Sequence, residues 1–285
     1  MSASSALTSD AGWRLLLDPP QTGAWNMAVD EVLLDGVAAG SAPPTIRFYQ
    51  WAPPCLSLGY FQAFEVVDAA GCRNLGVDVV RRPTGGRAIL HDRELTYSVA
   101  LPLRLLGDGG GVLTSYHRFS LALERGLRRL GVPVLLAPAT AAQSGPDHGP
   151  VCFDRPSAHE ILLGGRKLVG SAQMRRATGI LQHGSILIEP RIDRLLACLR
   201  LPDVSVDGIE GGVAGLAEVG DFEPAAIAVA LAEALVEEFG ATLVQSPLRP
   251  DERRAAEGVA ASKYQTVEWT ERLPAISARN TTRTR

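Results

Sequence analysis

The segment RRPTGGRAILHD, residues 81–92, decides how this sequence can fold, because it places a glycine pair between two β-like runs. Residues 77–82 are typical of a strand that ends at Pro83, and residues 88–91 of a returning strand. Adjacent glycines permit positive φ and let backbone N–H groups approach a ligand closely. The flanking arginines suit a phosphate or a carboxylate. A plain hairpin turn with surface arginines is equally compatible with this pattern.

Two common phosphate-binding motifs are excluded by the spacing of these glycines. The segment contains neither G-x-x-x-x-G-K-[ST] nor G-x-G-x-x-G. It therefore supports neither a P-loop nor a dinucleotide-binding site.

On both sides of this segment, strand and helix patterns alternate irregularly. We expect three hairpins, which pair residues 45–51 with 55–61, residues 88–91 with 95–101, and residues 160–163 with 166–171 around the Gly164-Gly165 turn. Further strands are expected at 13–18, 132–137, 180–188 and 242–245, and helices at 22–39, 115–130, 224–239 and 250–257. The 115–130 helix is expected to begin with Ser115 as its N-cap. Hairpins mixed with a few helices indicate an α+β fold with a mostly antiparallel sheet.

The length of 285 residues allows one large domain, or one domain with a small appendage. Residues 1–12 and 278–285 are polar and aperiodic, so we expect loose, disordered tails there. The glycine-rich stretch 207–220 is a candidate mobile connection. A small C-terminal subdomain is possible from about residue 221.

Composition argues against several classes of protein. The net charge is −3 and basic residues are scattered, so no nucleic-acid partner is expected. No run approaches 18 apolar residues, and the N-terminus lacks signal-peptide features, so neither a membrane span nor secretion is expected. The four cysteines form no C-x-x-C pair, which argues against structural zinc, and they fit reduced thiols in a cytoplasmic protein.

Cys152 opens the segment CFDRPSAHE, residues 152–160, behind a small, polar stretch at 139–149. A thiol attacks only as thiolate, and a nearby cation favours that form. Arg155, His159 and Lys167 are the nearby cations, and the Gly164-Gly165 hairpin would fold Lys167 back beside the residues that follow the cysteine. The competing interpretation is that a lone cysteine is a small buried hydrophobe. Cys55 and Cys198, with apolar neighbours, fit that interpretation better.

The third informative segment is GRKLVGSAQ at 165–173, followed by LQHGSIL at 181–187. Small residues beside polar ones suit strands that let a narrow ligand lie against the backbone. A small-residue sheet packed under a helix explains the same pattern. His183 is therefore either a structural histidine or a catalyst.

Together, the three segments resemble the lipoate-protein ligase and octanoyltransferase superfamily, from about Trp13 to Arg254. The resemblance implies a mixed sheet flanked by helices, shared with biotin protein ligases, and a catalytic domain over residues 13–254. It also implies a substrate site, whose expected residues are Arg82, Thr84, Gly85, Gly86, His91, Gly170, Ser171, Ala172, His183 and Gly184. In this site Lys167 would contact the acyl carbonyl, and His183 would stand near it.

Cys152 separates the branches of this superfamily. The pattern C-F-x-x-P-S-x-x-E, with Lys167 fifteen residues after Cys152, is similar to the cysteine-dependent octanoyltransferases. That resemblance implies a cytoplasmic acyltransferase of lipoate biosynthesis, with Cys152 as nucleophile, Lys167 as its charge partner, and no metal or cofactor. Its donor would be octanoyl-acyl carrier protein. Its acceptor would be a lysine of a lipoyl-domain protein, either glycine cleavage H protein or a 2-oxoacid dehydrogenase E2.

Three alternatives stay open at this point. An ATP-dependent lipoate ligase would activate the free acid as an adenylate and need no thiol. An amidotransferase would move octanoate between lipoyl-bearing proteins. A binding module would keep the fold without turnover. Backbone N–H groups near Gly85-Gly86 or at 170–172 are candidates for an oxyanion hole, and residues 56–60 for the wall of an acyl tunnel. Sequence does not choose between Lys167 and His183 as the acceptor of the incoming lysine's proton, and chain-length preference and oligomeric state stay open too.

Overall fold

The computed structural model describes residues 12–107, 111–138, 159–201 and 209–271. Cys152 and the stretch before it lie outside the described residues. So do the two expected tails, apart from Gly12, and Gly208 of the glycine-rich stretch.

Two sheets form the framework of the described residues. The larger sheet has the strand order β11-β1-β2-β6-β10-β9-β8-β7, with parallel pairing from β11 to β2 and antiparallel pairing beyond. Its strands are β1 (Trp13–Leu17), β2 (Thr45–Tyr49), β6 (Glu94–Pro102), β7 (Val134–Leu136), β8 (Ile161–Leu163), β9 (Arg166–Arg175), β10 (Gly179–Leu187) and β11 (Leu243–Gln245). The smaller sheet, in the order β4-β3-β5, consists of β3 (Cys55–Leu58), β4 (Asp78–Arg81) and β5 (Ile89–His91). The expected α+β class with a mixed, mostly antiparallel sheet is confirmed.

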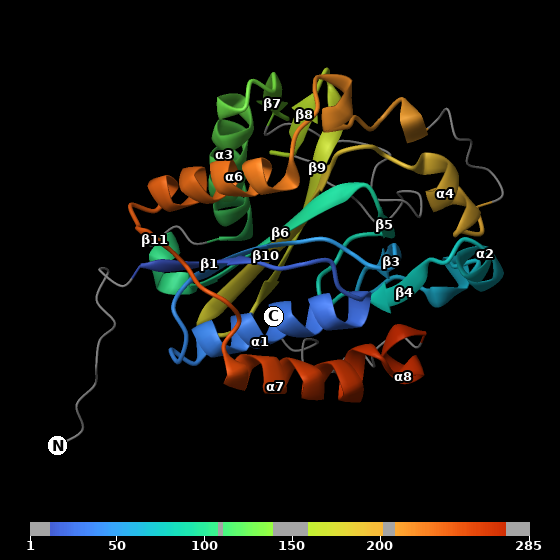
Figure 1. Cartoon of the computed structure of the whole chain (residues 1–285), viewed down its shortest axis with the longest axis horizontal. Helices are drawn as coiled ribbons and strands as arrows, with labels where there is room; N and C mark the ends of the chain where they lie inside the picture. The colour runs from blue at the N-terminus through green and yellow to red at the C-terminus, as the bar shows by residue number, and fades with distance from the viewer. Residues whose placement is uncertain (1–11, 108–110, 139–158, 202–208, 272–285) are drawn as a thin grey trace, which may run out of the picture.

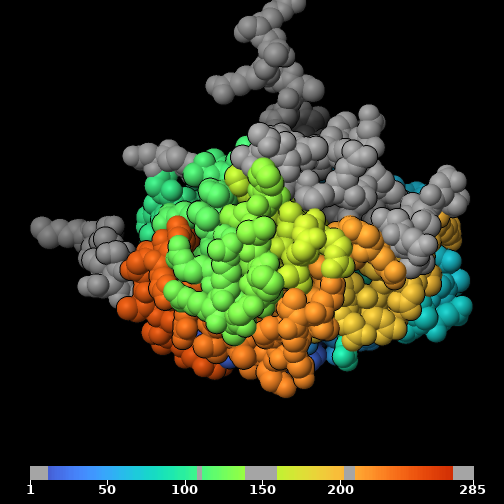
Figure 2. All heavy atoms as spheres, turned by 90° about the horizontal axis from the view of Figure 1, so that it is seen from above, coloured from blue at the N-terminus to red at the C-terminus, as the bar shows by residue number. Residues whose placement is uncertain are grey.

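Helices cover both faces of the larger sheet (Figure 1). On one face lie α1 (Gly23–Ala38), α7 (Pro250–Val259), the π-helical turn Ala260–Tyr264 and α8 (Val267–Thr270). On the other face α3 (Val112–Arg129) packs against α6 (Pro224–Glu238). Figure 2 shows α3 and α6 side by side on the surface, next to the outer strands. The remaining elements are α2 (Ala69–Asn74), α4 (Ile192–Ala197) and the 3₁₀ turns Phe64–Val66, Leu103–Leu106 and Leu216–Glu218.

Apolar burial explains this layering. Separate clusters of buried side chains fill the spaces under α3 and α6, under α1 and α7, and between the small sheet and α2 and α4. α1 begins after the N-cap Thr22, whose side chain accepts a hydrogen bond from the Trp25 amide. It ends at Ala38, and Gly40, with φ of 71°, follows the C-cap Ala39. Within the described ranges, no helix combines the length and apolar character needed to cross a bilayer.

Two expected hairpins are wrong. β2 pairs with β1 and β6 in the larger sheet, whereas β3 pairs with β4 and β5 in the smaller one. Likewise β5 and β6 belong to different sheets, and the segment 81–92 links two strands that both flank β3 instead of pairing with each other. Alternating apolar residues indicate a strand but do not specify the strand with which it pairs. The short connections between these strands were therefore wrongly predicted to be hairpin turns.

The hairpin around Gly164-Gly165 is confirmed, with φ of 57° and 79° at the two glycines and antiparallel pairing of β8 with β9. The expected start of α3 is wrong. The helix begins at Val112 with Gly111 as N-cap, and Ser115 lies inside it, donating to the Val112 carbonyl over 2.9 Å. A serine inside a helix can bond to the preceding turn, which removes the basis for reading it as a cap.

Candidate active site

A pocket with about 430 Å³ of space lies where the two sheets meet. Its lining residues are Met27, Tyr49, Trp51, Ser57, Arg82, Gly85, Gly86, Ile89, His91, Thr96, Gly170, Ser171, Ala172, His183, Gly184 and Ser185. Nine of the ten residues expected at the substrate site are in this set, and Thr84 is the exception. Of the expected tunnel wall, only Ser57 lines the pocket, while Leu56 and Leu58 pack into the core of the small sheet.

The glycine turn is held in place by Arg82, which is buried. Its Nε and one terminal nitrogen donate to the Gly85 carbonyl, at 3.2 and 2.9 Å, and that same terminal nitrogen donates to the Arg87 carbonyl over 2.8 Å. The other terminal nitrogen donates to the carbonyl and hydroxyl oxygens of Ser57, at 3.0 and 3.1 Å. These contacts tie the turn to β3 through one side chain. Arg82 therefore shapes the turn, and its expected contact with a phosphate or carboxylate stays a prediction.

Two glycines in and beside the turn are needed for steric reasons. Gly86 has φ of 93°, a conformation that residues with a side chain rarely adopt. A Cβ on Gly59, at the end of β3, would lie 1.8 Å from the Gly86 carbonyl oxygen. The backbone of the turn therefore packs directly against Gly59, the residue that follows β3.

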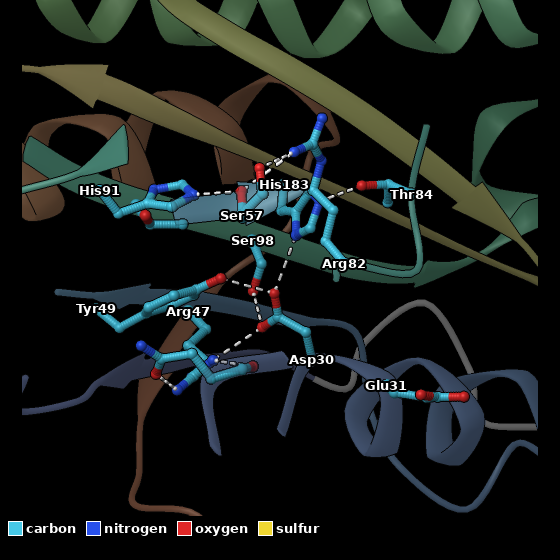
Figure 3. Close-up of polar contacts among 12 residues, drawn as sticks. Asp30, Glu31, Arg47, Tyr49, Ser57, Arg82, Thr84, His91, Ser98 and His183 are labelled. Atoms are coloured by element: carbon cyan, nitrogen blue, oxygen red, sulfur yellow. Dashed lines mark hydrogen bonds and ion pairs between the residues drawn. The ribbon is translucent and has the colours of Figure 1, made fainter. Parts of the chain in front are cut away.

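His183 lies between two oxygen partners (Figure 3). Its Nε2 is 2.7 Å from the Thr84 hydroxyl, and its Nδ1 is 3.3 Å from Oδ2 of Asp30, on α1. Thr84 does not line the pocket, but its hydroxyl contacts His183, which does. Sheet register places His183 beside Ser98 on β6 and Ala172 on β9, so these three side chains face the same helix.

Asp30 is fully buried and accepts hydrogen bonds from several elements. Arg47 and Ser98 donate to its Oδ1 over 2.9 and 2.8 Å, and the Tyr49 hydroxyl donates to its Oδ2 over 2.8 Å. Burial alone would raise the pKa of this carboxyl, but the hydrogen bond with His183 and the charge of Arg47 outweigh it and lower the pKa. Asp30 is therefore a carboxylate at neutral pH.

His91 occupies the opposite wall. Its Nε2 is 2.8 Å from the Ser57 hydroxyl, its ring stacks on Trp51 with centroids 3.9 Å apart, and its Nδ1 lies 3.5 Å from a Glu94 oxygen. Burial lowers the pKa of His91, and the nearby Glu94 carboxylate only partly opposes this. The ring is therefore neutral at pH 7 and supplies a flat, mostly apolar surface to the pocket.

Ser171 belongs to a chain of polar side chains behind β9 and β10. Its hydroxyl is 2.8 Å from the Tyr97 hydroxyl, which accepts from Gln182 over 2.8 Å, and Gln182 in turn accepts from Gln173 over 2.6 Å. Burial raises the pKa of Tyr97 to about 12, so the phenol stays protonated. These hydrogen bonds hold the residues at the floor of the pocket in place from the side of the sheet that faces α3.

Lys167 is buried at the start of β9, where its Nζ donates to Oε1 of Glu160 over 2.6 Å. The hairpin thus brings Lys167 beside Glu160, the last residue of the segment that Cys152 opens, as expected. Lys167 is not among the residues that line the pocket. Cys152 lies outside the described residues, so its role as nucleophile stays a prediction. Cys55 and Cys198 are both buried, as expected.

Asp30, Arg47 and Glu94 are the charged residues of this site that sequence reasoning missed. Each belongs to no motif, and their partners are distant in sequence. A signal for Asp30 was present, because it lies one helical turn from Met27 and Leu33 on the apolar side of the 22–39 helix. Among the described residues, no group of three or more His, Cys, Asp or Glu side chains is arranged to hold a metal ion.

Solved structures with a similar fold indicate the class of protein to which this chain belongs. A lipoate-protein ligase A structure bound with ATP superposes with a TM-score of 0.78 at 25% identity, covering 93% of this chain and 100% of that one. The structure of Ta0514 from T. acidophilum with bound lipoic acid gives a TM-score of 0.75 at 25% identity, covering 92% and 100%.

Sequence comparison then places the chain within that class. The lipoyl protein ligase A/B catalytic domain family matches residues 22–240, and the chain belongs to this family. A relative from Kyrpidia tusciae, named octanoyltransferase LipM, is 42% identical over 277 residues, covering 90% of this chain and 97% of the relative. One of the same name from Moorella thermoacetica is 46% identical over 199 residues, covering 68% and 71%.

Proposed function

We propose that this chain is an octanoyltransferase that takes the octanoyl group from octanoyl-acyl carrier protein and transfers it to a lysine of a lipoyl-domain protein. The observation that carries this proposal is the near full-length similarity to relatives named octanoyltransferase LipM. The pocket supports it, because its apolar side chains (Met27, Trp51, Ile89) suit an alkyl chain. The proposed acceptors are the glycine cleavage H protein and the lipoyl domain of a 2-oxoacid dehydrogenase E2, and the proposed compartment is the cytoplasm.

The proposed reaction has two steps. The Cys152 thiolate attacks the donor thioester, a new C–S bond forms as the C–S bond to the carrier protein breaks, and the departing carrier-protein thiolate takes up the proton that the Cys152 thiol released. The neutral amine of the acceptor lysine then attacks the octanoyl thioester on Cys152, a C–N bond forms as the C–S bond breaks, and one proton of the nitrogen passes to the departing Cys152 thiolate. A covalent intermediate of this kind divides one difficult encounter into two easier ones.

Lys167 is the proposed cation that favours the Cys152 thiolate in both steps. Its ammonium is already buried and oriented by Glu160, so it would be pre-positioned beside the segment that carries the cysteine. The oxyanion of each tetrahedral intermediate would be held by backbone N–H groups of the 85–86 turn or of residues 170–172. These five residues all line the pocket.

The test is octanoyl transfer without ATP. Purified protein, octanoyl-acyl carrier protein and apo lipoyl domain are mixed, and the intact mass of the lipoyl domain is followed over time. The domain should gain one octanoyl group with wild-type protein, and none with Cys152→Ala or when its acceptor lysine is replaced by arginine. Modification that requires ATP and free octanoate, and is indifferent to Cys152→Ala, would instead identify an ATP-dependent ligase.

A further inference from the structure

Two cysteines that are far apart in sequence meet in the core beside the small sheet. Cys72 lies in α2, and Cys198 is the C-cap of α4. The Cys72 sulfur lies 3.8 Å from the Cys198 carbonyl oxygen, and the two thiols also share a hydrogen bond. Both side chains are buried in the cluster that fills the space between the small sheet, α2 and α4. The fold thus places two sulfur atoms in contact, which no spacing in the sequence indicates.

Direct backbone contacts hold α2 and the end of α4 together at this point (Figure 1). The Asp68 N–H donates to the Cys198 carbonyl over 2.9 Å, and Cys72 follows Asp68 by one helical turn. A Cβ on Gly71 would lie 2.0 Å from the Ala197 carbonyl oxygen. The step from the thiol contact to a covalent S–S bond of about 2.05 Å is therefore short.

An open groove reaches one thiol of this pair. The groove has about 1140 Å³ of space and lies between α2, β4 and the C-terminal segment around Tyr264 and Val267. Cys55 and Cys72 line it, whereas Cys198 does not. None of its lining residues lines the active-site pocket. A small oxidant can therefore reach the pair without entering the active site.

One thiol of the pair ionises more readily than the other. The hydrogen bond from Cys72 and the positive charge of Arg194 outweigh burial and lower the pKa of Cys198. The same hydrogen bond, together with burial, raises the pKa of Cys72. Because the thiolate is the form that attacks an oxidant, Cys198 supplies the reactive sulfur and Cys72 supplies the second thiol.

We propose that Cys72 and Cys198 form a redox-sensitive pair, which a peroxide oxidises to a disulfide between α2 and α4 and which a dithiol reduces again. Both thiols are free in the structure, so the resting state is the reduced one. Disulfides in proteins of reducing compartments are usually transient and redox-sensing. This inference does not depend on the proposed octanoyl transfer.

The proposed oxidation has two steps. The Cys198 thiolate attacks a peroxide oxygen, an S–O bond forms as the O–O bond breaks, and the departing hydroxide takes up the proton that Cys198 released. The Cys72 sulfur then attacks the sulfur of the sulfenic acid, an S–S bond forms as the S–O bond breaks, and the second hydroxide takes the Cys72 proton. The two thiols lose two electrons and two protons, and one hydrogen peroxide becomes two waters.

The disulfide should stabilise the folded protein, because it joins residues that are 126 positions apart. A link across such a separation restricts the unfolded chain and leaves the native contacts in place. We therefore expect the melting temperature of the oxidised protein to exceed that of the reduced protein by about 5–10 °C.

The experiment uses Cys152→Ala protein, so that the proposed nucleophile cannot react. The folded protein is incubated with hydrogen peroxide, the peroxide is removed with catalase, and free thiols are alkylated with N-ethylmaleimide in denaturant. We expect two of the three remaining thiols to escape alkylation. A tryptic map should show one linkage, between Cys72 and Cys198, which dithiothreitol removes.

Cys55→Ser is the matched control, because Cys55 is also buried and lines the same groove. Added to the Cys152→Ala protein, it should preserve the linkage and the rise in melting temperature, whereas Cys72→Ser and Cys198→Ser should abolish both. Oxidation without an S–S bond, a linkage through Cys55, or a disulfide that leaves the melting temperature unchanged would overturn the inference. If the serine variants do not fold, the peptide map and melting temperatures of the Cys152→Ala protein still decide.

Discussion

At the scale of single residues, Gly184 shows how closely the pocket floor is packed. A Cβ on Gly184 would lie 2.6 Å from both the Gly170 carbonyl oxygen and a ring carbon of Tyr97, and 2.7 Å from the Ser171 hydroxyl. Real Cβ atoms almost never approach so closely, and two of these neighbours are tied into the chain behind the sheet. The absence of a side chain at 184 is therefore a structural requirement.

Gly184→Ala should lower the free energy of unfolding by about 1–3 kcal/mol, because overpacking forces the neighbours to shift. It should also slow both steps of the proposed reaction by displacing Ser171. The matched control is Gly85→Ala, since an added Cβ there meets no atom within 4 Å and Gly85 has no positive φ. Denaturant unfolding measures both variants. Equal stability of Gly184→Ala and wild type would contradict this packing.

The residues that sequence could place at the pocket are those inside contiguous motifs. The segments around Gly85, Ser171 and His183 carry small and polar residues in a recognisable order, and nine of the ten expected residues line one pocket. Asp30 and Arg47 could not be found in this way. Their meeting depends on α1 crossing the sheet over β2, which no local pattern specifies.

At the scale of elements, α1 connects the pocket to the C-terminal helices. Asp30 points toward the sheet, and the next residue, Glu31, points away from it (Figure 3). Glu31 accepts from Lys263 over 2.7 Å and from the Tyr264 hydroxyl over 2.6 Å, and from Arg176 over 3.0 Å. One helix turn thus supports the site on one side and anchors the segment after α7 on the other.

Glu31→Gln should destabilise the protein at pH 7 by about 1–3 kcal/mol, because charged hydrogen bonds are lost. Burial raises the pKa of Glu31, but the bonds and charges from Lys263, Tyr264 and Arg176 lower it below the ordinary 4.5. This carboxylate therefore contributes stability that is present above pH 4.5 and lost as the pH falls through the lowered value.

Wild type should thus lose more stability than Glu31→Gln when the pH falls from 7 to below 4. Asp35→Asn is the matched control, because Asp35 lies on the same helix, also contacts Arg176, and is 55% exposed. Its effect should be small at every pH. Urea unfolding at several pH values gives the comparison. Parallel stability curves for wild type and Glu31→Gln would contradict the assignment.

The sequence predicted individual helices and strands better than it predicted which strands pair with one another. The helices at 22–39 and 224–239 and the hairpin around Gly164-Gly165 were predicted nearly to their ends, because caps, glycines and apolar spacing are local signals. The division of β2 and β3 between two sheets was missed. That division depends on which apolar face finds a partner in the folded core, and this is decided by distant parts of the chain.

At the scale of the whole molecule, two adjacent arginines join the pocket to the end of the described chain. Arg81 donates to the carbonyls of Trp269 and Thr270 on one side and to those of Gly59 and Gln62 on the other. Arg82 holds the glycine turn that rests against Gly59. The C-terminal helices, the loop at 59–62 and the pocket turn therefore form one connected structure.

The central claim for the molecule is that the octanoyl group passes through Cys152. The most direct measurement is the intact mass of the protein after incubation with octanoyl-acyl carrier protein and no acceptor. We predict a mass increase of one octanoyl group that hydroxylamine removes and that is absent in Cys152→Ala. An adduct that persists in Cys152→Ala, or no adduct on the wild-type protein, would contradict the account.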